Sequence, residues 1–147
     1  MTLQIETTSE IDATAASAWN VFGEGFGEWA DWADGITSSK LDGPVKQGAI
    51  RTNDAVGFGI LTQELTRFDR QARELTYEIR TGMPAVIKGA RNRWIIEDTG
   101  DGRSRITGNA TFELAWWALP LSPLLRRKMT GSLESFTAEF AAHAGRA

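Results

Sequence analysis

The chain has 147 residues, with 16 Lys or Arg against 19 Asp or Glu, which gives a formal net charge of −3 at pH 7. It has no cysteine and a single histidine, His143, so disulfides, thiolate metal sites, multi-histidine metal sites and cysteine nucleophiles are excluded. Six tryptophans contrast with this shortage of titratable chemistry. The composition predicts one domain over residues 1–147 that is rich in aromatic surface and uses no metal ion or cofactor.

The mild negative charge argues against a nucleic-acid partner, for which a basic stripe is expected. Residues 1–20 lack the charged and apolar regions of a signal peptide. The longest apolar stretch, from Leu114 to Leu125, includes two prolines and falls short of the roughly 20 residues that a membrane-spanning helix needs. A cytoplasmic protein without a transmembrane segment is expected.

The first elements are a strand and two short helices. Residues 2–11 alternate loosely between apolar and polar and predict a strand, and the Asp12-Ala13-Thr14 sequence that follows is typical of a helix start. Helical spacing then runs as far as Gly23, and a second short helix is expected over residues 27–34. The glycines between them lack the spacing and the preceding strand of a dinucleotide motif, so a mobile loop beside a cavity mouth is expected.

From Gly35 onward, alternating segments separated by turn residues predict six further strands. They are expected over residues 36–41, 48–53, 58–68, 73–80, 87–98 and 104–114. The Gly100-Asp101-Gly102 sequence predicts a hairpin between the last two strands.

The C-terminal segment predicts a long helix, because its apolar residues recur at intervals of three or four: Leu125, Met129, Leu133, Phe136 and Phe140. A six- to seven-stranded antiparallel sheet has one apolar face to cover, and this helix supplies the matching stripe. The expected fold is α+β, a curved sheet around one long helix with a cavity between them.

This order of elements, with Ile11-Asp12-Ala13 leading into a helix that carries Trp19, resembles the START/Bet v 1-like superfamily. The segments of residues 77–84 (YEIRTGMP), 92–94 (NRW) and 100–104 (GDGRS) are similar to its bacterial polyketide cyclase/dehydrase branch. The resemblance covers nearly the whole chain. It implies a helix-grip fold whose deep apolar cavity binds lipids, polyketides or other hydrophobic small molecules, and it brings no fixed catalytic residues.

The candidate ligand-binding residues are those that strand and helix spacing direct toward the expected cavity. They are Trp29, Trp32, Leu61, Gln63, Leu75, Tyr77, Ile79, Asn92, Trp94, Ile96, Phe112, Met129, Leu133 and Phe136. For Trp29 and Trp32, the alternative is that they cap the core. For Asn92, which could orient a ligand carbonyl or hydroxyl, the alternative is a structural hydrogen bond.

Two functions are compatible with these residues. The first is binding of a hydrophobic small molecule without catalysis. The second is a polyketide aromatase/cyclase or dehydratase in which Tyr77 or Asn92 acts on the substrate, although a buried structural tyrosine with one hydrogen-bond partner is the simpler explanation of Tyr77. Arg51 on one strand and Arg67 on the next would select a carboxylate or an enolate if they point inward, unless a bulge shifts the register.

The apolar segment before the last helix has three interpretations. Trp116, Trp117, Leu119 and Leu121 precede the basic Arg126-Arg127-Lys128 sequence, a composition typical of weak contact with a membrane interface. The same side chains could instead form a homodimer interface or pack under the start of the helix.

Overall fold

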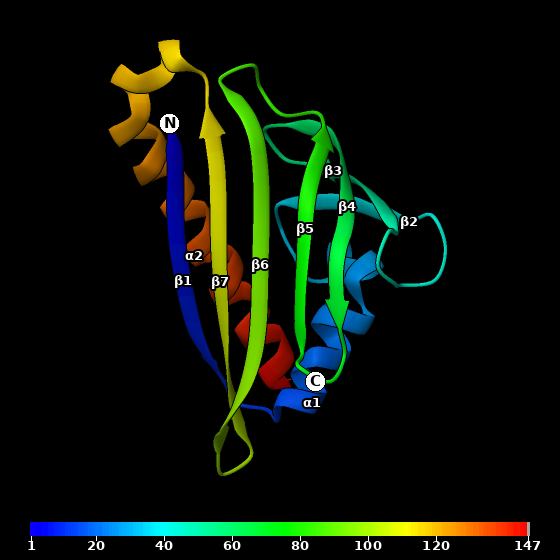
Figure 1. The fold of residues 1–147 in the computed structure, drawn as a ribbon. Coiled ribbons are helices and arrows are strands. Elements are labelled where there is room, and N and C mark those ends of the chain that lie inside the picture. The colour runs from blue at the N-terminus through cyan, green and yellow to red at the C-terminus, as the bar shows by residue number, and fades with distance from the viewer. Residues whose placement is uncertain (147) are drawn as a thin grey trace.

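The computed structural model describes residues 1–146 and contains, within them, a seven-stranded antiparallel sheet in the order β1-β7-β6-β5-β4-β3-β2 (Figure 1). The first strand therefore pairs with the last, and consecutive hairpins build the remainder. The strands are β1 (Thr2–Ile11), β2 (Ile36–Leu41), β3 (Ile50–Ala55), β4 (Gly59–Asp69), β5 (Glu74–Thr81), β6 (Ile87–Gly100) and β7 (Arg103–Leu114).

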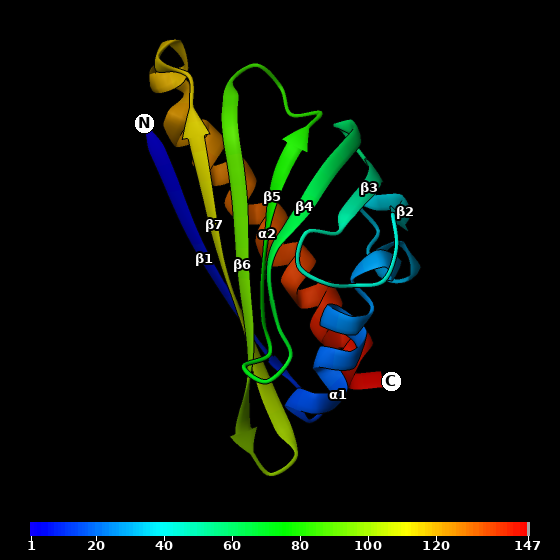
Figure 2. The same ribbon diagram turned by 45° about the vertical axis from the view of Figure 1, so that its right-hand side comes forward.

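The helical elements are grouped against one face of this sheet. The 25-residue helix α2 crosses the concave face, and the short helices that follow β1 lie beside the C-terminal half of α2 (Figure 2). The helical elements in chain order are α1 (Ala15–Trp19), the π-helical η1 (Asn20–Glu24), the 3-10 helices η2 (Phe26–Asp31) and η3 (Trp116–Leu121), and α2 (Ser122–Arg146). The expected α+β helix-grip fold is confirmed.

Helix α1 begins where the sequence indicates, because the Thr14 hydroxyl accepts a hydrogen bond from the Ser17 N–H at 3.1 Å. The glycine-rich segment of residues 23–27, expected to be a mobile loop, instead forms a π-helical turn that leads into η2. Gly23 is buried, and a Cβ atom there would overlap the Trp19 ring. The glycine thus permits close packing between the turn and the preceding helix.

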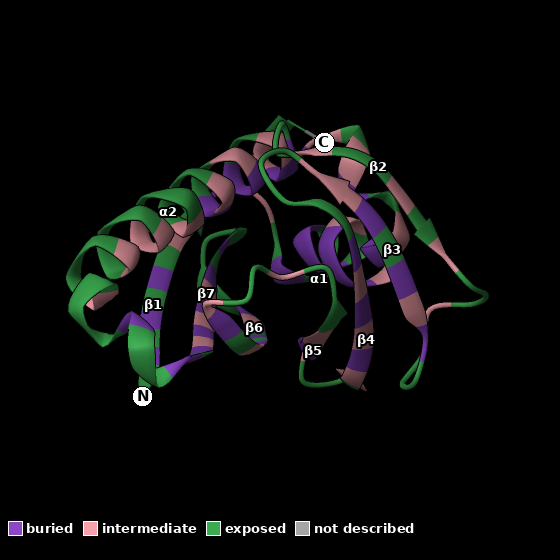
Figure 3. Cartoon of the chain, turned by 90° about the horizontal axis from the view of Figure 1, so that it is seen from above, coloured by how far each residue is buried: buried purple, intermediate pink, exposed green. Residues whose placement is uncertain are grey.

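The core between sheet and helices divides into two clusters along α2. The larger lies under the short helices and is aromatic, whereas the smaller lies under the first half of α2 and is mainly aliphatic. Leu133 packs against both. Buried and exposed positions alternate along several of the strands (Figure 3), as expected for a sheet that is covered on one face.

One strand departs from simple alternation. The pairing of β4 with β5 shifts between Leu65 and Arg67, which is a β-bulge. Arg67 therefore lies on the outer face, where it pairs with Glu74 at 3.3 Å, and the interpretation of Arg67 as an inward arginine is wrong. Arg51, on β3, is the arginine that faces inward and is fully buried. No helix within residues 1–146 has the length and apolar character to cross a membrane.

Candidate ligand-binding site

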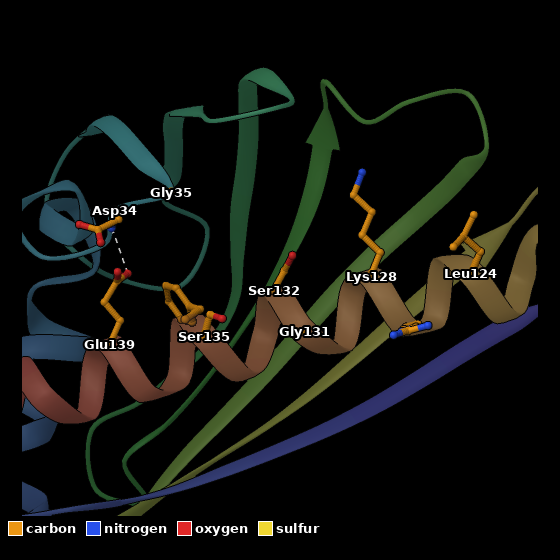
Figure 4. A pocket seen from close by; sticks show the side chains of 10 residues that line it. Asp34, Gly35, Leu124, Lys128, Gly131, Ser132, Ser135 and Glu139 are labelled. Carbon is orange, nitrogen blue, oxygen red and sulfur yellow. Dashed lines mark hydrogen bonds between the residues drawn. The ribbon is translucent and has the colours of Figure 1, made fainter.

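A groove of about 930 Å³ runs along α2 from Leu124 to Glu139 (Figure 4). Its wall on α2 is made largely of small and long polar side chains, among them Lys128, Ser132 and Ser135. The far end is closed by the loop before β2, where the Asp34 N–H donates to Glu139 Oε1 at 3.0 Å. Partial burial raises the pKa of Glu139, and the nearby Asp34 carboxylate adds to the increase.

Phe136 joins this groove to the aromatic core. Its side chain lines the groove, and its ring centroid lies 5.2 Å from that of Trp32, 5.3 Å from that of Trp29 and 5.6 Å from that of Trp94. A molecule in the groove would therefore rest on a ring that is itself packed on three tryptophans.

Behind these rings lies a buried cation. The Arg51 guanidinium carbon is 3.7 Å from the ring centroid of Phe26, 4.0 Å from that of Trp29 and 5.1 Å from that of Tyr77. Cation–π attraction of this kind strengthens when the charge is desolvated. Burial lowers the pKa of Arg51 to about 10, so the side chain remains protonated at pH 7.

Arg51 is held by neutral groups. Its Nη1 donates to the Phe26 carbonyl at 2.7 Å, and its Nε donates to Gln63 Oε1 at 2.8 Å. Asn53 Nδ2 donates to the same Gln63 oxygen at 3.1 Å. None of the ion pairs among residues 1–146 includes Arg51. The interior therefore contains a positive charge that no carboxylate of these residues neutralises.

Several buried polar atoms around this charge also lack hydrogen-bond partners within the described chain. They are Arg51 Nη2 and Trp94 Nε1, which both face the Tyr77 hydroxyl without closing a hydrogen bond of good geometry, and Asn53 Oδ1 and Asn92 Oδ1. Unsatisfied buried polar groups are costly, and a concentration of them on one concave face is typical of a ligand site.

Tyr77 lies among these atoms, directly opposite Asn92 in the pairing of β5 with β6. Burial raises the pKa of the Tyr77 phenol above its ordinary value of 10, and the adjacent Arg51 charge opposes this increase. Tyr77 is therefore a neutral phenol at physiological pH, able to donate or accept one hydrogen bond.

On the outer face of the sheet, by contrast, buried charge is paired. There the buried carboxylate of Glu74 accepts from Arg93 Nε and pairs with Arg67, in a depression of about 570 Å³. Arg67 and Arg93 on the outer face thus pair with a carboxylate, whereas Arg51 on the inner face does not.

The fourteen residues predicted to contact ligand all pack inside the grip, but Phe136 is the one among them that lines the groove. Nine lie in or against the aromatic cluster or between the clusters: Trp29, Trp32, Leu75, Tyr77, Trp94, Ile96, Leu133, Phe136 and, through its pairing with Tyr77, Asn92. Phe112 belongs to the aliphatic cluster, with Ile79 and Met129 packed against it. Leu61 and Gln63 are buried on β4.

Sequence reasoning missed the polar groove residues Ser132 and Ser135, although their positions beside Phe136 on a helix could have indicated them. The single histidine, His143, is half-buried, and its imidazole stacks on Trp32 with a centroid separation of 6.2 Å. No group of three or more His, Asp or Glu side chains within residues 1–146 is arranged to hold a metal ion.

The fold is shared with several solved structures. An uncharacterized protein from Bacillus thuringiensis superposes with a TM-score of 0.82 at 19% identity, covering 99% of this chain and 100% of its own. Norcoclaurine synthase from Thalictrum flavum gives 0.76 at 14% identity over 98% of this chain and 94% of its own. The Ara h 8.0201 structure gives 0.69 at 15% identity over 97% and 99%. A search of curated proteins gives no significant match.

A curved antiparallel sheet that grips one long helix is the fold of these structures, and with the family match over residues 2–145 it places the chain in the START/Bet v 1-like superfamily. Within that class, residues 2–145 match the family described as polyketide cyclase / dehydrase and lipid transport. The chain belongs to this family.

Proposed function

We propose that the chain binds a hydrophobic small molecule, such as a lipid or a polyketide, between the curved sheet and α2. The groove along α2 carries this proposal, because about 930 Å³ is the size of a typical small-molecule site and its floor is the Phe136 ring. Family membership agrees with a ligand of this class. We retain the cytoplasm as the expected compartment.

The buried charge of Arg51 favours a ligand with an acidic or enolate group at one end. A desolvated guanidinium forms strong, directional hydrogen bonds with a carboxylate, and Nη2, which faces the Tyr77 hydroxyl, is the Arg51 nitrogen that neither Phe26 nor Gln63 holds. Contact with the ligand requires the rings of Trp29 and Phe136 to move apart, because Trp29 lies between Arg51 and the groove residue Phe136. A groove that rests on the Phe136 ring and has the Arg51 cation behind it would therefore select an amphipathic acid.

Native mass spectrometry of protein purified from its own host tests the proposal, with a co-purifying molecule of mass consistent with the groove as the expected result. Ser135→Trp should fill the groove beside Phe136 and abolish this retention. Glu134→Trp is the matched control, because Glu134 is the adjacent exposed residue of α2 and does not line the groove. Equal retention by both folded variants would contradict the assignment.

A second candidate function is cyclisation or dehydration of a polyketide-like chain in the same interior. The observation that favours it is the neutral phenol of Tyr77 beside the cation of Arg51 and opposite the Asn92 amide. Such groups can donate a proton to, or stabilise, a developing enolate. Tyr77→Phe should reduce turnover of a reactive poly-β-ketone by about 100-fold or more if the phenol is catalytic. Unchanged turnover would remove Tyr77 from the reaction and leave binding as the function.

A further inference from the structure

The exposed large apolar side chains are collected at one end of the molecule. Among residues 1–146, nine such side chains are exposed, and they belong to three segments: the N-terminus, the β3–β4 turn, and η3 with the start of α2. Figures 1 and 2 both place these segments at the same end, opposite the short helices α1 and η1. The nine are Met1, Val56, Phe58, Ile60, Trp116, Trp117, Leu119, Leu121 and Leu124. We call this end the apolar rim.

The largest part of the apolar rim is held outward by ordered backbone. Trp116 is 81% exposed and Trp117 is 51% exposed, although both belong to the 3-10 helix η3. Ala118 is fully buried, and its N–H donates to the Ala115 carbonyl at 2.9 Å. The Ala115 N–H in turn donates to the Val86 carbonyl at 2.9 Å. The two indoles thus project into solvent from a fixed base, so the interpretation that they pack under the helix start is wrong.

The charge around the apolar rim is positive although the whole chain carries −3. Residues 115–133 contain Arg126, Arg127 and Lys128 and no acidic residue. All three cations are exposed, and none belongs to an ion pair among residues 1–146. Arg126 donates to the Gln4 carbonyl at 3.0 Å. The acids that flank this segment in sequence are Glu134, which is exposed on α2, and Glu113, which accepts a hydrogen bond from Thr2 Oγ1.

Exposed tryptophan and leucine beside free cations is the surface that binds an anionic lipid interface, in which indoles occupy the headgroup level and cations pair with phosphate or serine carboxylate. A second copy of this chain would bring its own three cations against these, which disfavours a symmetric dimer through the same surface. We propose that the apolar rim docks onto an anionic bilayer.

Docking would place the groove at the membrane. Leu124, Arg127 and Lys128 belong both to the rim region and to the lining of the groove. A hydrophobic molecule could therefore pass between bilayer and groove without crossing water. This last step rests on the proposed function, whereas the docking itself does not.

Co-sedimentation with vesicles tests the docking. The full chain should sediment with vesicles of one part phosphatidylserine to two parts phosphatidylcholine, and much more weakly with phosphatidylcholine alone. Trp116→Ala with Trp117→Ala should weaken binding by on the order of tenfold or more, since each indole buries a large apolar area. Arg127→Gln with Lys128→Gln should weaken it by about fivefold per charge and remove the preference for phosphatidylserine.

The matched control is Lys40→Gln with Arg103→Gln, which removes two exposed cations outside the apolar rim. This variant should bind as the parent does. Circular dichroism verifies that each variant is folded, as expected for substitutions of exposed side chains. Absence of sedimentation with serine-containing vesicles at low salt would overturn the docking, and so would equal binding by the double tryptophan variant.

Sedimentation velocity tests the alternative partner, which is a second copy of this chain. A parent dimer that the double tryptophan variant converts to a monomer, without any vesicle binding, would assign the rim to self-association and overturn the proposal. Failure of the proposed function is recognised separately, because Ser135→Trp would then leave the co-purifying mass unchanged while vesicle binding is measured independently.

Discussion

The Arg51 guanidinium carbon lies over the Phe26 ring, 3.7 Å from its centroid, and the Arg51 Nη1 donates to the carbonyl oxygen of the same residue at 2.7 Å. One side chain of β3 thus fastens η2 to the sheet twice, through the ring and through the backbone. Because η2 also supplies Trp29, this contact determines where the aromatic floor behind the groove lies.

Substitution of Arg51 should separate packing from charge. Arg51→Ala leaves a void between three rings and an unpaired Phe26 carbonyl, and should lower the free energy of unfolding by about 2–4 kcal/mol. Arg51→Met fills most of the void and removes a desolvated charge, so it should stay within about 1 kcal/mol of the parent. Urea unfolding measures both values. An equal loss in the free energy of unfolding in the two variants would show that the hydrogen bonds of Arg51, and not the volume of its side chain, account for its contribution to stability.

The phenol of Tyr77 can be titrated without interference, because it is the sole tyrosine of the chain. Tyrosinate absorbance should rise with a midpoint above 10 in the native protein, since burial raises the pKa of Tyr77, and near 10 in denaturant. The stabilisation linked to this shift is complete below pH 10 and is lost as pH rises through the native pKa. In Arg51→Met the midpoint should be still higher. A native midpoint at or below 10 would contradict the buried environment.

Substitution of alanine for glycine should change the stability of the fold in opposite directions at two positions, one on β7 and one on α2. A Cβ at Gly108 would overlap the Trp94 ring, so Gly108→Ala should destabilise the fold by about 1–3 kcal/mol. A Cβ at Gly131 meets open space on α2, so Gly131→Ala should stabilise it by about 0.5–1 kcal/mol. Thermal unfolding of the two variants provides the measurement, and a destabilised Gly131→Ala protein would argue against the helical geometry there.

The contribution of Glu139, at the closed end of the groove, to the stability of the fold should depend on pH. The pKa of Glu139 is raised in the folded state, so the folded state binds more protons and stability falls as pH rises through that pKa. Glu139→Gln keeps an oxygen to accept the Asp34 N–H and removes the repulsion between the two carboxylates. The variant should unfold at a higher temperature than the parent at pH 7, and at the same temperature once acid has protonated Glu139. An identical difference at both pH values would exclude ionisation as the cause.

The strands were predictable because their alternation is regular: two of them, residues 2–11 and 36–41, have the expected bounds. The bulge after Leu65 could not be predicted, because it depends on the pairing of β4 with β5 and leaves no local signal in the sequence. The depth of Arg51 was also hidden, because an arginine on a half-polar strand is ordinarily exposed. Its burial requires η2 to bring Phe26 and Trp29 across from a segment that the sequence indicates is a loop and a short helix.

For the groove, too, one part was predictable from the sequence and another part was not. Helical spacing predicted the inner stripe of α2, including Phe136 and Leu133, and the structure buries that stripe in part. The space that can hold a molecule lies along a neighbouring stripe of serines and lysine, whose exposure is set by the distance between α2 and the loop at Asp34. Distances between elements are a property of the packed fold, which spacing in one element does not encode.

The pairing of β1 with β7 has a consequence for how the chain folds. Thr2 lies opposite Glu113, so this edge of the sheet closes a loop that includes most of the chain, whereas β4 to β7 are joined by local hairpins. Loop-closure entropy makes such long-range pairing slow relative to hairpin formation. During synthesis, β1 emerges first and waits with Leu3 and Ile5 uncovered until β7 has left the ribosome. We expect the hairpin strands to form the folding nucleus and β1 to join last.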